Sequence, residues 1–199
     1  MSRKYEQTKR AEQQNETRRR IARAAVELHS LVGPARTTVS AVADRAGVQR
    51  NTFYRHFPDD RSLMAACSAL FDSEHPLPDP RSWVRESDPT VRAESALSAL
   101  YAYWDQHESL IGNVLRDAET DDIVREAASR SWGAALTQIR DSIVGPLDST
   151  PRKQSMAELI AFADLAISFR TWRTLVRDNG LTSQRAAALM ASHLASEAF

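Results

Sequence analysis

The stretch GVQRNTFYRHF, residues 47–57, combines three aromatic side chains with arginine, histidine, asparagine and glutamine. These polar groups match the hydrogen-bonding groups of a DNA duplex. An arginine guanidinium can form two hydrogen bonds to guanine, and a glutamine or asparagine amide can pair with adenine. Threonine, tyrosine and histidine side chains offer donors to phosphate oxygens. The segment therefore has the chemistry needed to contact DNA.

Two short helices that meet at Gly47 would present these groups to a partner. Gly47 can adopt the positive φ that a sharp turn requires. The apolar residues of the two helices can pack together, and the small alanines permit a close crossing: Val42, Ala43, Ala46, Val48, Phe53 and Phe57. The remaining side chains then point outward: Gln49, Arg50, Asn51, Tyr54 and Arg55. This is a helix-turn-helix unit, in which one helix braces another that enters the major groove.

Residues 38–63, TVSAVADRAGVQRNTFYRHFPDDRSL, resemble the helix-turn-helix signature of the TetR family of bacterial transcriptional regulators. The matching positions are Thr38, Val42, Ala43, Ala46, Gly47, Val48, Thr52, Tyr54, His56, Phe57 and Leu63. The resemblance covers about residues 17–65, and the rest of the chain agrees with the family only in helix number and length. It implies phosphate contacts from Thr38, Thr52, Tyr54 and His56. It also implies that Gln49, Arg50 and Asn51 read bases.

The sequence departs from the family at Asp60, where a lysine that meets a phosphate is common. An aspartate cannot bind phosphate, and Arg61 is the neighbouring cation that could replace the lysine. Asp60 instead suits a cap or a negative charge at a helix N-terminus.

Charge is divided unevenly along the 199-residue chain, although its formal net charge is zero. Residues 1–65 carry 13 of the 26 basic residues but only 7 of the 26 acidic ones. Such asymmetry indicates a head that binds a polyanion, joined to a neutral-to-acidic body. A solvated charged face would give the same count.

The sequence as a whole predicts an all-α fold with about nine helices and no strand. Helical periodicity starts near Glu16 and stops at Gly33-Pro34, and later helix starts are indicated at Asp88-Pro89 and Thr150-Pro151. Four prolines interrupt residues 75–89. We predict a flexible basic arm over residues 1–15, a helix-turn-helix domain over 16–60, and a ligand-binding and dimerisation domain over 61–199.

The predicted ligand-binding and dimerisation domain is rich in aromatic residues. Each of them taken alone is best explained by ordinary core packing, but together they could line an apolar pocket. The pocket candidates are Trp83, Tyr101, Trp104, Trp132, Phe162 and Phe169. The TetR resemblance implies such a pocket for a small, largely apolar effector.

The last helices carry a second face, rich in small residues, that could form a four-helix bundle with a second copy or pack within one chain. Its members are Ile160, Ala163, Ile167, Thr171, Thr174, Ala187, Met190 and Leu194. One short recognition helix reads few base pairs, so a homodimer on a palindromic site is favoured.

Enzymatic chemistry has little support in the sequence. The five histidines show no metal spacing, and there is no glycine-rich phosphate loop or nucleophile elbow. The acidic residues at 117–126 could form a cation site, but helix-end stabilisation explains them without a ligand. We expect no cofactor and no metal.

Cys67 is the only cysteine, and the N-terminal residues lack the apolar core of a signal peptide. We expect a cytoplasmic protein that does not contact the membrane. The sequence favours a transcriptional regulator, most simply a repressor that a small molecule releases from DNA. Two alternatives remain: an architectural or cell-division factor on the same scaffold without a ligand, and a helical enzyme or carrier whose basic head binds nucleic acid loosely.

Overall fold

The computed structural model describes residues 2–145 and 153–198, and within these ranges every regular element is helical. The all-α prediction is confirmed, with ten α-helices where about nine were expected. They are α1 (Ser2–Val32), α2 (Val39–Arg45), α3 (Arg50–His56), α4 (Asp60–Glu74), α5 (Pro89–Gln106), α6 (Glu108–Asp117), α7 (Asp122–Val144), α8 (Lys153–Ile167), α9 (Phe169–Arg173) and α10 (Ser183–Ala198). Shorter helical turns are η1 (Pro34–Arg36), η2 (Pro80–Ser82) and the π-helical η3 (Thr174–Asp178).

Several helices begin after a short polar residue. Its side chain accepts hydrogen bonds from first-turn backbone N–H groups, which have no partner within the helix. Thr38 caps α2 through Ala41 N, and Asp88 caps α5 through Thr90 N and Val91 N. Asp121 accepts from the second and third residues of α7. Asp59 caps α4, so Asp60 lies in the first turn and contributes only its charge.

Helix α1 begins at Ser2, whereas helical periodicity was expected from about Glu16. The flexibility of the predicted arm over residues 1–15 stays a prediction. Residues 5–16 are exposed and mostly polar. Because this part of the helix has no buried face, its sequence lacks the apolar periodicity from which a helix is predicted. Within residues 75–89, Pro80–Ser82 forms one 3₁₀ turn. The predicted start at Thr150-Pro151 lies outside the described residues.

The chain divides into two compact units. The first contains Met1–Pro76 and Ser109–Ser131, and the second contains Leu77–Glu108 and Trp132–Phe199. The predicted functional division at residue 60 stays a prediction, and the first unit also includes most of α6 and the start of α7. Asn113 Nδ2 on α6 donates to His29 O (3.0 Å) and Ser30 O (2.9 Å). Asp117 accepts from Ala35 N at 2.9 Å.

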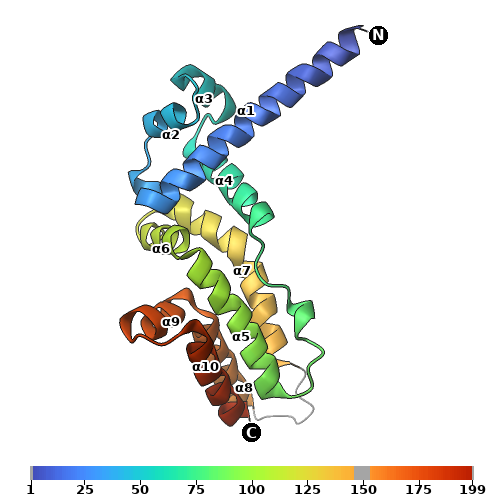
Figure 1. Cartoon of the computed structure of the whole chain (residues 1–199), viewed down its shortest axis with the longest axis vertical. Helices are drawn as coiled ribbons and strands as arrows, with labels where there is room; N and C mark the ends of the chain where they lie inside the picture. The colour runs from blue at the N-terminus through green and yellow to red at the C-terminus, as the bar shows by residue number, and fades with distance from the viewer. Residues whose placement is uncertain (1, 146–152, 199) are drawn as a thin grey trace. The chain divides into compact units, whose positions relative to one another are not determined.

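The core of the first unit joins α1 to the three helices that follow it, α2, α3 and α4 (Figure 1). Its buried members are Ile21, Ala22, Ala24, Ala25, Val42, Ala43, Ala46, Phe53, Phe57, Leu63 and Cys67. Burial raises the pKa of the Cys67 thiol to about 12. The packing predicted between the two short helices is therefore present, and α1 and α4 complete it.

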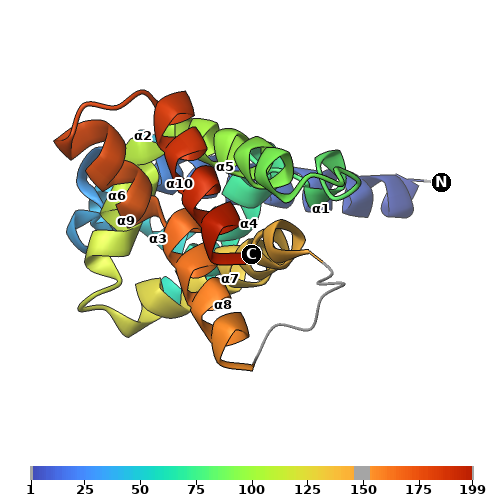
Figure 2. The same ribbon diagram turned by 90° about the horizontal axis from the view of Figure 1, so that it is seen from below.

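In the second unit, α10 packs along α5 and beside α8 (Figure 2). Ala96, Leu97, Leu100 and Tyr101 of α5 are fully buried. Across the described residues, no helix is long and apolar enough to cross a membrane.

Candidate nucleic-acid interface

The turn between α2 and α3 depends on Gly47, which has a φ of +64°. Ala46 and Gly47 donate backbone hydrogen bonds to Val42 O and Asp44 O, which ends α2. Val48 N then donates to Ala43 O at 2.9 Å and sets the direction in which α3 starts. The glycine that sequence analysis placed at the turn thus has the backbone conformation expected of it.

The predicted reading residues lie at the exposed start of α3. Gln49 is the N-cap residue, but its side chain forms no capping hydrogen bond. Arg50 and Asn51 occupy the first turn, and all three side chains are exposed. Phe53 and Phe57 face the opposite way and are only 2% and 0% exposed. Helix α3 therefore has a fixed buried face and a solvent-accessible polar face.

The four predicted phosphate contacts surround this polar face in different environments. Thr38 accepts from Ala41 N at 3.2 Å, which leaves its own hydroxyl hydrogen free to donate. Thr52 is half-buried and Tyr54 is 46% exposed. The Tyr54 ring meets Phe53 edge-on at 5.5 Å between ring centroids. Burial, followed by the charges of Arg55 and Arg18, lowers the pKa of His56 from 6.5.

Arg18 of α1 braces the end of α3, a role that sequence analysis missed. Its Nη1 donates to His56 O at 2.6 Å, and its guanidinium carbon lies 4.3 Å from the centre of the Phe57 ring. The triple arginine at 18–20 was visible in the sequence only as charge. Nothing in its spacing distinguishes Arg18, which is half-buried, from the exposed Arg19 and Arg20.

Arg61 pairs with Glu126 of α7 in the structure. This pairing holds its guanidinium against α7, so the sequence suggestion that it replaces the missing phosphate-binding lysine gains no support.

The six predicted pocket aromatics belong to the second unit, and five of them are buried. Trp83 Nε1 donates to Ser142 Oγ at 2.8 Å, and Tyr101 Oη donates to Ala166 O at 2.8 Å. Trp104 Nε1 donates to Ile167 O at 3.2 Å, and its ring meets Phe169 edge-on. Such burial and bonding are what core packing produces, so the pocket role stays a prediction for these residues.

Trp132 and Phe162 differ from the other aromatic candidates. Trp132 is 7% exposed, and its indole N–H has no acceptor among the described residues. Phe162 is half-buried and lines a groove of about 510 Å³ on the second unit. The groove is otherwise lined by Leu165, Arg170, Thr171, Thr174, Leu175, Leu189, Met190 and His193.

The eight predicted dimer residues divide into two groups. Five are buried within the second unit: Ala163, Ile167, Ala187, Met190 and Leu194. Ile160 and Thr171 are half-buried and Thr174 is exposed. Leu165 on α8 is 52% exposed, and it lines the same groove as the predicted dimer residues Thr171, Thr174 and Met190, so the dimer face stays a prediction. Helical periodicity identified apolar positions but could not tell which of them α5 already covers.

Comparison with protein families gives a match at the helix-turn-helix. Residues 21–67 match the model described as bacterial regulatory proteins, tetR family. Over 47 residues the chain is 49% identical to uncharacterised helix-turn-helix-type transcriptional regulators of Mycobacterium tuberculosis and Mycobacterium bovis. The match covers 24% of this chain and a quarter of the length of those relatives.

Solved structures resemble the chain over most of its length. A tetR-family transcriptional regulator from Streptomyces coelicolor has a TM-score of 0.66 at 17% identity, covering 92% of this chain and 80% of the other. A transcriptional regulator from Aquifex aeolicus has a TM-score of 0.53 at 16% identity, covering 90% and 98%. A candidate regulator from Saccharomonospora viridis, solved in complex with choline, has a TM-score of 0.56 at 17% identity, covering 92% and 95%. These similarities support the fold.

Proposed function

We propose that this chain, whose residues 21–67 match the tetR family of bacterial regulatory proteins, is a cytoplasmic, homodimeric repressor of the TetR type. It binds a palindromic operator through α3, and a small molecule releases it. The matched family and the similar solved structures are transcriptional regulators, not enzymes.

The observation that carries the proposal is the two-sided character of α3. Phe53 and Phe57 anchor the helix in the core, while Gln49, Arg50 and Asn51 are exposed at its N-terminal end. A recognition helix reads bases mainly from this end. Amide and guanidinium groups there can distinguish base pairs in the major groove. The buried side of α3 fixes the position of these groups, as base recognition requires.

Selection of bound sequences from random duplexes tests the proposal. We expect a palindrome whose half-sites lie about 34–36 Å apart, or a multiple of that spacing. Binding without sequence preference, together with a steep dependence on salt, would instead indicate contacts to the phosphate backbone alone.

Two substitutions in α3 separate base reading from phosphate contact. Arg50→Ala should cost about 1–3 kcal/mol on the selected operator and relax the preference at one base pair. Tyr54→Phe should weaken binding to operator and random DNA alike, because a phosphate contact carries no sequence information. Equal losses on both duplexes for Arg50→Ala would remove its reading role.

The effector site is supported by the unpaired indole N–H of Trp132. A buried donor without an acceptor costs about 1–3 kcal/mol, which an acceptor on a bound ligand would recover. Release of DNA requires that the ligand bind the DNA-incompetent state more tightly, typically by about 1–3 kcal/mol. Apolar and cationic compounds form a suitable screen, and choline belongs in it because a protein of similar fold was solved with choline.

Trp132→Phe tests this site, because phenylalanine removes the N–H while keeping an aromatic ring. We expect a weaker response to any compound found in the screen, with DNA affinity in its absence unchanged. Trp83→Phe is the control, since the Trp83 N–H already has an acceptor in Ser142. An equal response in both variants would exclude a ligand contact at Trp132.

The dimer interface is proposed at the groove around Leu165, where apolar side chains of α8 and α10 are accessible. Leu165→Glu should shift the protein from dimer to monomer in sedimentation equilibrium, because a dimer would bury the new carboxylate. Val91→Glu is the matched control, since Val91 on α5 is similarly exposed at 46%. A Leu165→Glu protein that remains dimeric would place the interface elsewhere.

A further inference from the structure

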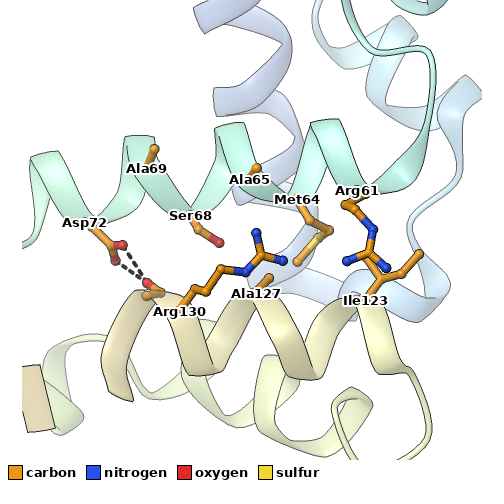
Figure 3. Close-up of a pocket in the computed structure, with 10 residues that line it drawn as sticks. Arg61, Met64, Ala65, Ser68, Ala69, Asp72, Ile123, Ala127 and Arg130 are labelled. Carbon is orange, nitrogen blue, oxygen red and sulfur yellow. Dashed lines mark hydrogen bonds between the residues drawn. The ribbon is translucent and has the colours of Figure 1, made fainter. Parts of the chain in front are cut away.

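A pocket of about 170 Å³ lies between α4 and α7 within the first unit (Figure 3). Small and apolar side chains of both helices line its centre: Met64, Ala65, Ala69, Ile123 and Ala127. Polar side chains complete the lining: Arg61, Ser68, Asp72, Arg130 and Ser131. The volume suits a small organic molecule rather than a drug-sized one.

One end of this α4–α7 pocket has more positive than negative charge. Arg61 and Arg130 donate to the same carboxylate oxygen, Oε2 of Glu126, and the Arg130 contact measures 3.3 Å. Neither arginine pairs with another carboxylate among the described residues. Each guanidinium has several donors, so two cations that share one carboxylate retain unused N–H groups and an excess of one positive charge.

The other end has the opposite sign. Ser131 Oγ lies 2.6 Å from both carboxylate oxygens of Asp72. A hydroxyl has a single hydrogen, so this half-buried carboxylate receives one hydrogen bond although it can accept several. No cation pairs with Asp72 in the described part of the chain. Burial raises the pKa of Asp72, and the Ser131 hydrogen bond opposes that shift. A ligand cation would offset the cost of burying this charge.

We propose that the α4–α7 pocket binds a small aminocarboxylate whose two charged ends are joined by an apolar chain. Its carboxylate binds Arg61 and Arg130, its chain covers Ala65 and Ala127, and its ammonium binds Asp72. Figure 3 shows the Arg130 side chain extending toward Arg61, with Asp72 at the opposite end of the pocket from Arg61. This charge arrangement favours a dipolar ligand over a simple anion or cation.

The helix geometry limits the length of the ligand. Arg61 and Asp72 are separated on α4 by roughly 16 Å along the helix axis. The Arg130 side chain extends along the pocket toward Arg61 and shortens the gap that a ligand must span (Figure 3). A chain of several carbon atoms between the ammonium and the carboxylate is therefore expected, and an α-amino acid with adjacent charges does not fit both ends.

The site also joins α4, which directly follows the recognition helix, to α7. A ligand carboxylate would compete with Glu126 for Arg61 and replace a direct ion pair between the two helices with a bridged contact. Any effect of this on operator affinity rests on the proposed DNA-binding function. Binding of the ligand itself does not.

Titration calorimetry on the full chain without DNA tests the site. The probes are unbranched ω-aminocarboxylates from aminobutanoate to aminooctanoate, with hexanoate and hexylamine as single-charge controls. We expect saturable binding with a dissociation constant in the millimolar range or tighter for at least one chain length. Each single-charge probe should bind at least about tenfold more weakly than that aminocarboxylate, because each lacks one charge-assisted contact. No saturable binding by any member of the series, or equal binding of hexanoate, would overturn the proposal.

Two variants identify the contacts, and each has a matched control on the same helix. Arg130→Gln and Asp72→Asn should each raise the dissociation constant of the best probe by at least about tenfold. Arg125→Gln on α7 and Glu74→Gln on α4 remove charges that pair outside the pocket, and should leave it unchanged. Equal affinities in all four variants would also refute the site. Thermal melts of each variant without ligand establish that it is folded.

The DNA arm of the experiment is separate. The best probe is added to the protein with the selected operator, and the operator affinity of the wild type is compared with that of Asp72→Asn. Probe binding without any change in operator affinity would retain the ligand site and exclude its regulatory consequence. A chain that binds the probe but no specific DNA would contradict the proposed function and leave the site intact.

Discussion

Replacement of Arg18 by methionine would remove the brace between α1 and the end of α3 while keeping an unbranched side chain. The substitution takes away the hydrogen bond to His56 O, at 2.6 Å, and the cation above the Phe57 ring, at 4.3 Å. A hydrogen bond from a charged group contributes about 1.5–3 kcal/mol. An accessible cation–π contact contributes about 0.5–1 kcal/mol.

The two contributions share one guanidinium and are not additive, so we expect Arg18→Met to lower the free energy of unfolding by about 2–3 kcal/mol. Urea denaturation measures this loss. Arg19→Met is the control, because Arg19 is exposed and such surface changes usually alter stability by less than about 0.5 kcal/mol. Equal stability of the two variants would show that the brace seen in the structure contributes nothing.

A second measurement tests the same contact through electrostatics. The charge of Arg18 is one cause of the lowered pKa of His56, after burial and the charge of Arg55. Arg18→Met should therefore move the His56 pKa upward, toward 6.5, in an NMR titration, whereas Arg19→Met should not. On DNA, a loosened α3 should lose affinity for operator and random duplex while keeping its base preference. An unchanged His56 pKa would contradict the proximity of the two groups.

Three further predictions follow from single residues. Gly47→Ala should destabilise the protein by about 1 kcal/mol, because the positive φ disfavours a side chain even though no atom lies within 4 Å of the added carbon. Equal free energies of unfolding for the variant and the wild type in urea would contradict this. Burial lowers the pKa of His29 to about 4, so the unfolded chain binds a proton first as the pH falls. His29 should thus cost no free energy of unfolding above pH 6.5, and should lower that free energy by up to about 3 kcal/mol toward pH 4. Denaturation over a pH series measures this loss, and an equal slope in the wild type and in His29→Gln would refute it. Tyr101→Phe should cost about 1 kcal/mol in thermal or urea unfolding by removing the donor to Ala166 O, and a neutral result would show that this carbonyl does not need it.

Local sequence signals located the helix-turn-helix and the helix boundaries at Gly33-Pro34 and Asp88-Pro89. Thr38 and Asp88 cap the helices that follow them, and Gly47 has a positive φ where α2 has ended. Each signal involves residues within about four positions of one another, because capping and turn formation use neighbouring backbone groups. Arg18, the α4–α7 pocket and the groove around Leu165 could not be predicted from such local signals, because each depends on residues far apart in the sequence.

The sequence by itself determined the helical class, the α2–α3 unit and the polar end of α3, since helical periodicity identifies which side of a helix is apolar. Only the tertiary structure decided which segment covers that side. Arg18 and His56 are 38 positions apart, Arg61 and Glu126 are 65 apart, and Tyr101 and Ala166 are 65 apart. Such contacts depend on how distant helices pack, and an amphipathic pattern is equally compatible with several partners. The physical reason is that burial is favourable in proportion to the apolar area removed from water, whichever neighbour removes it.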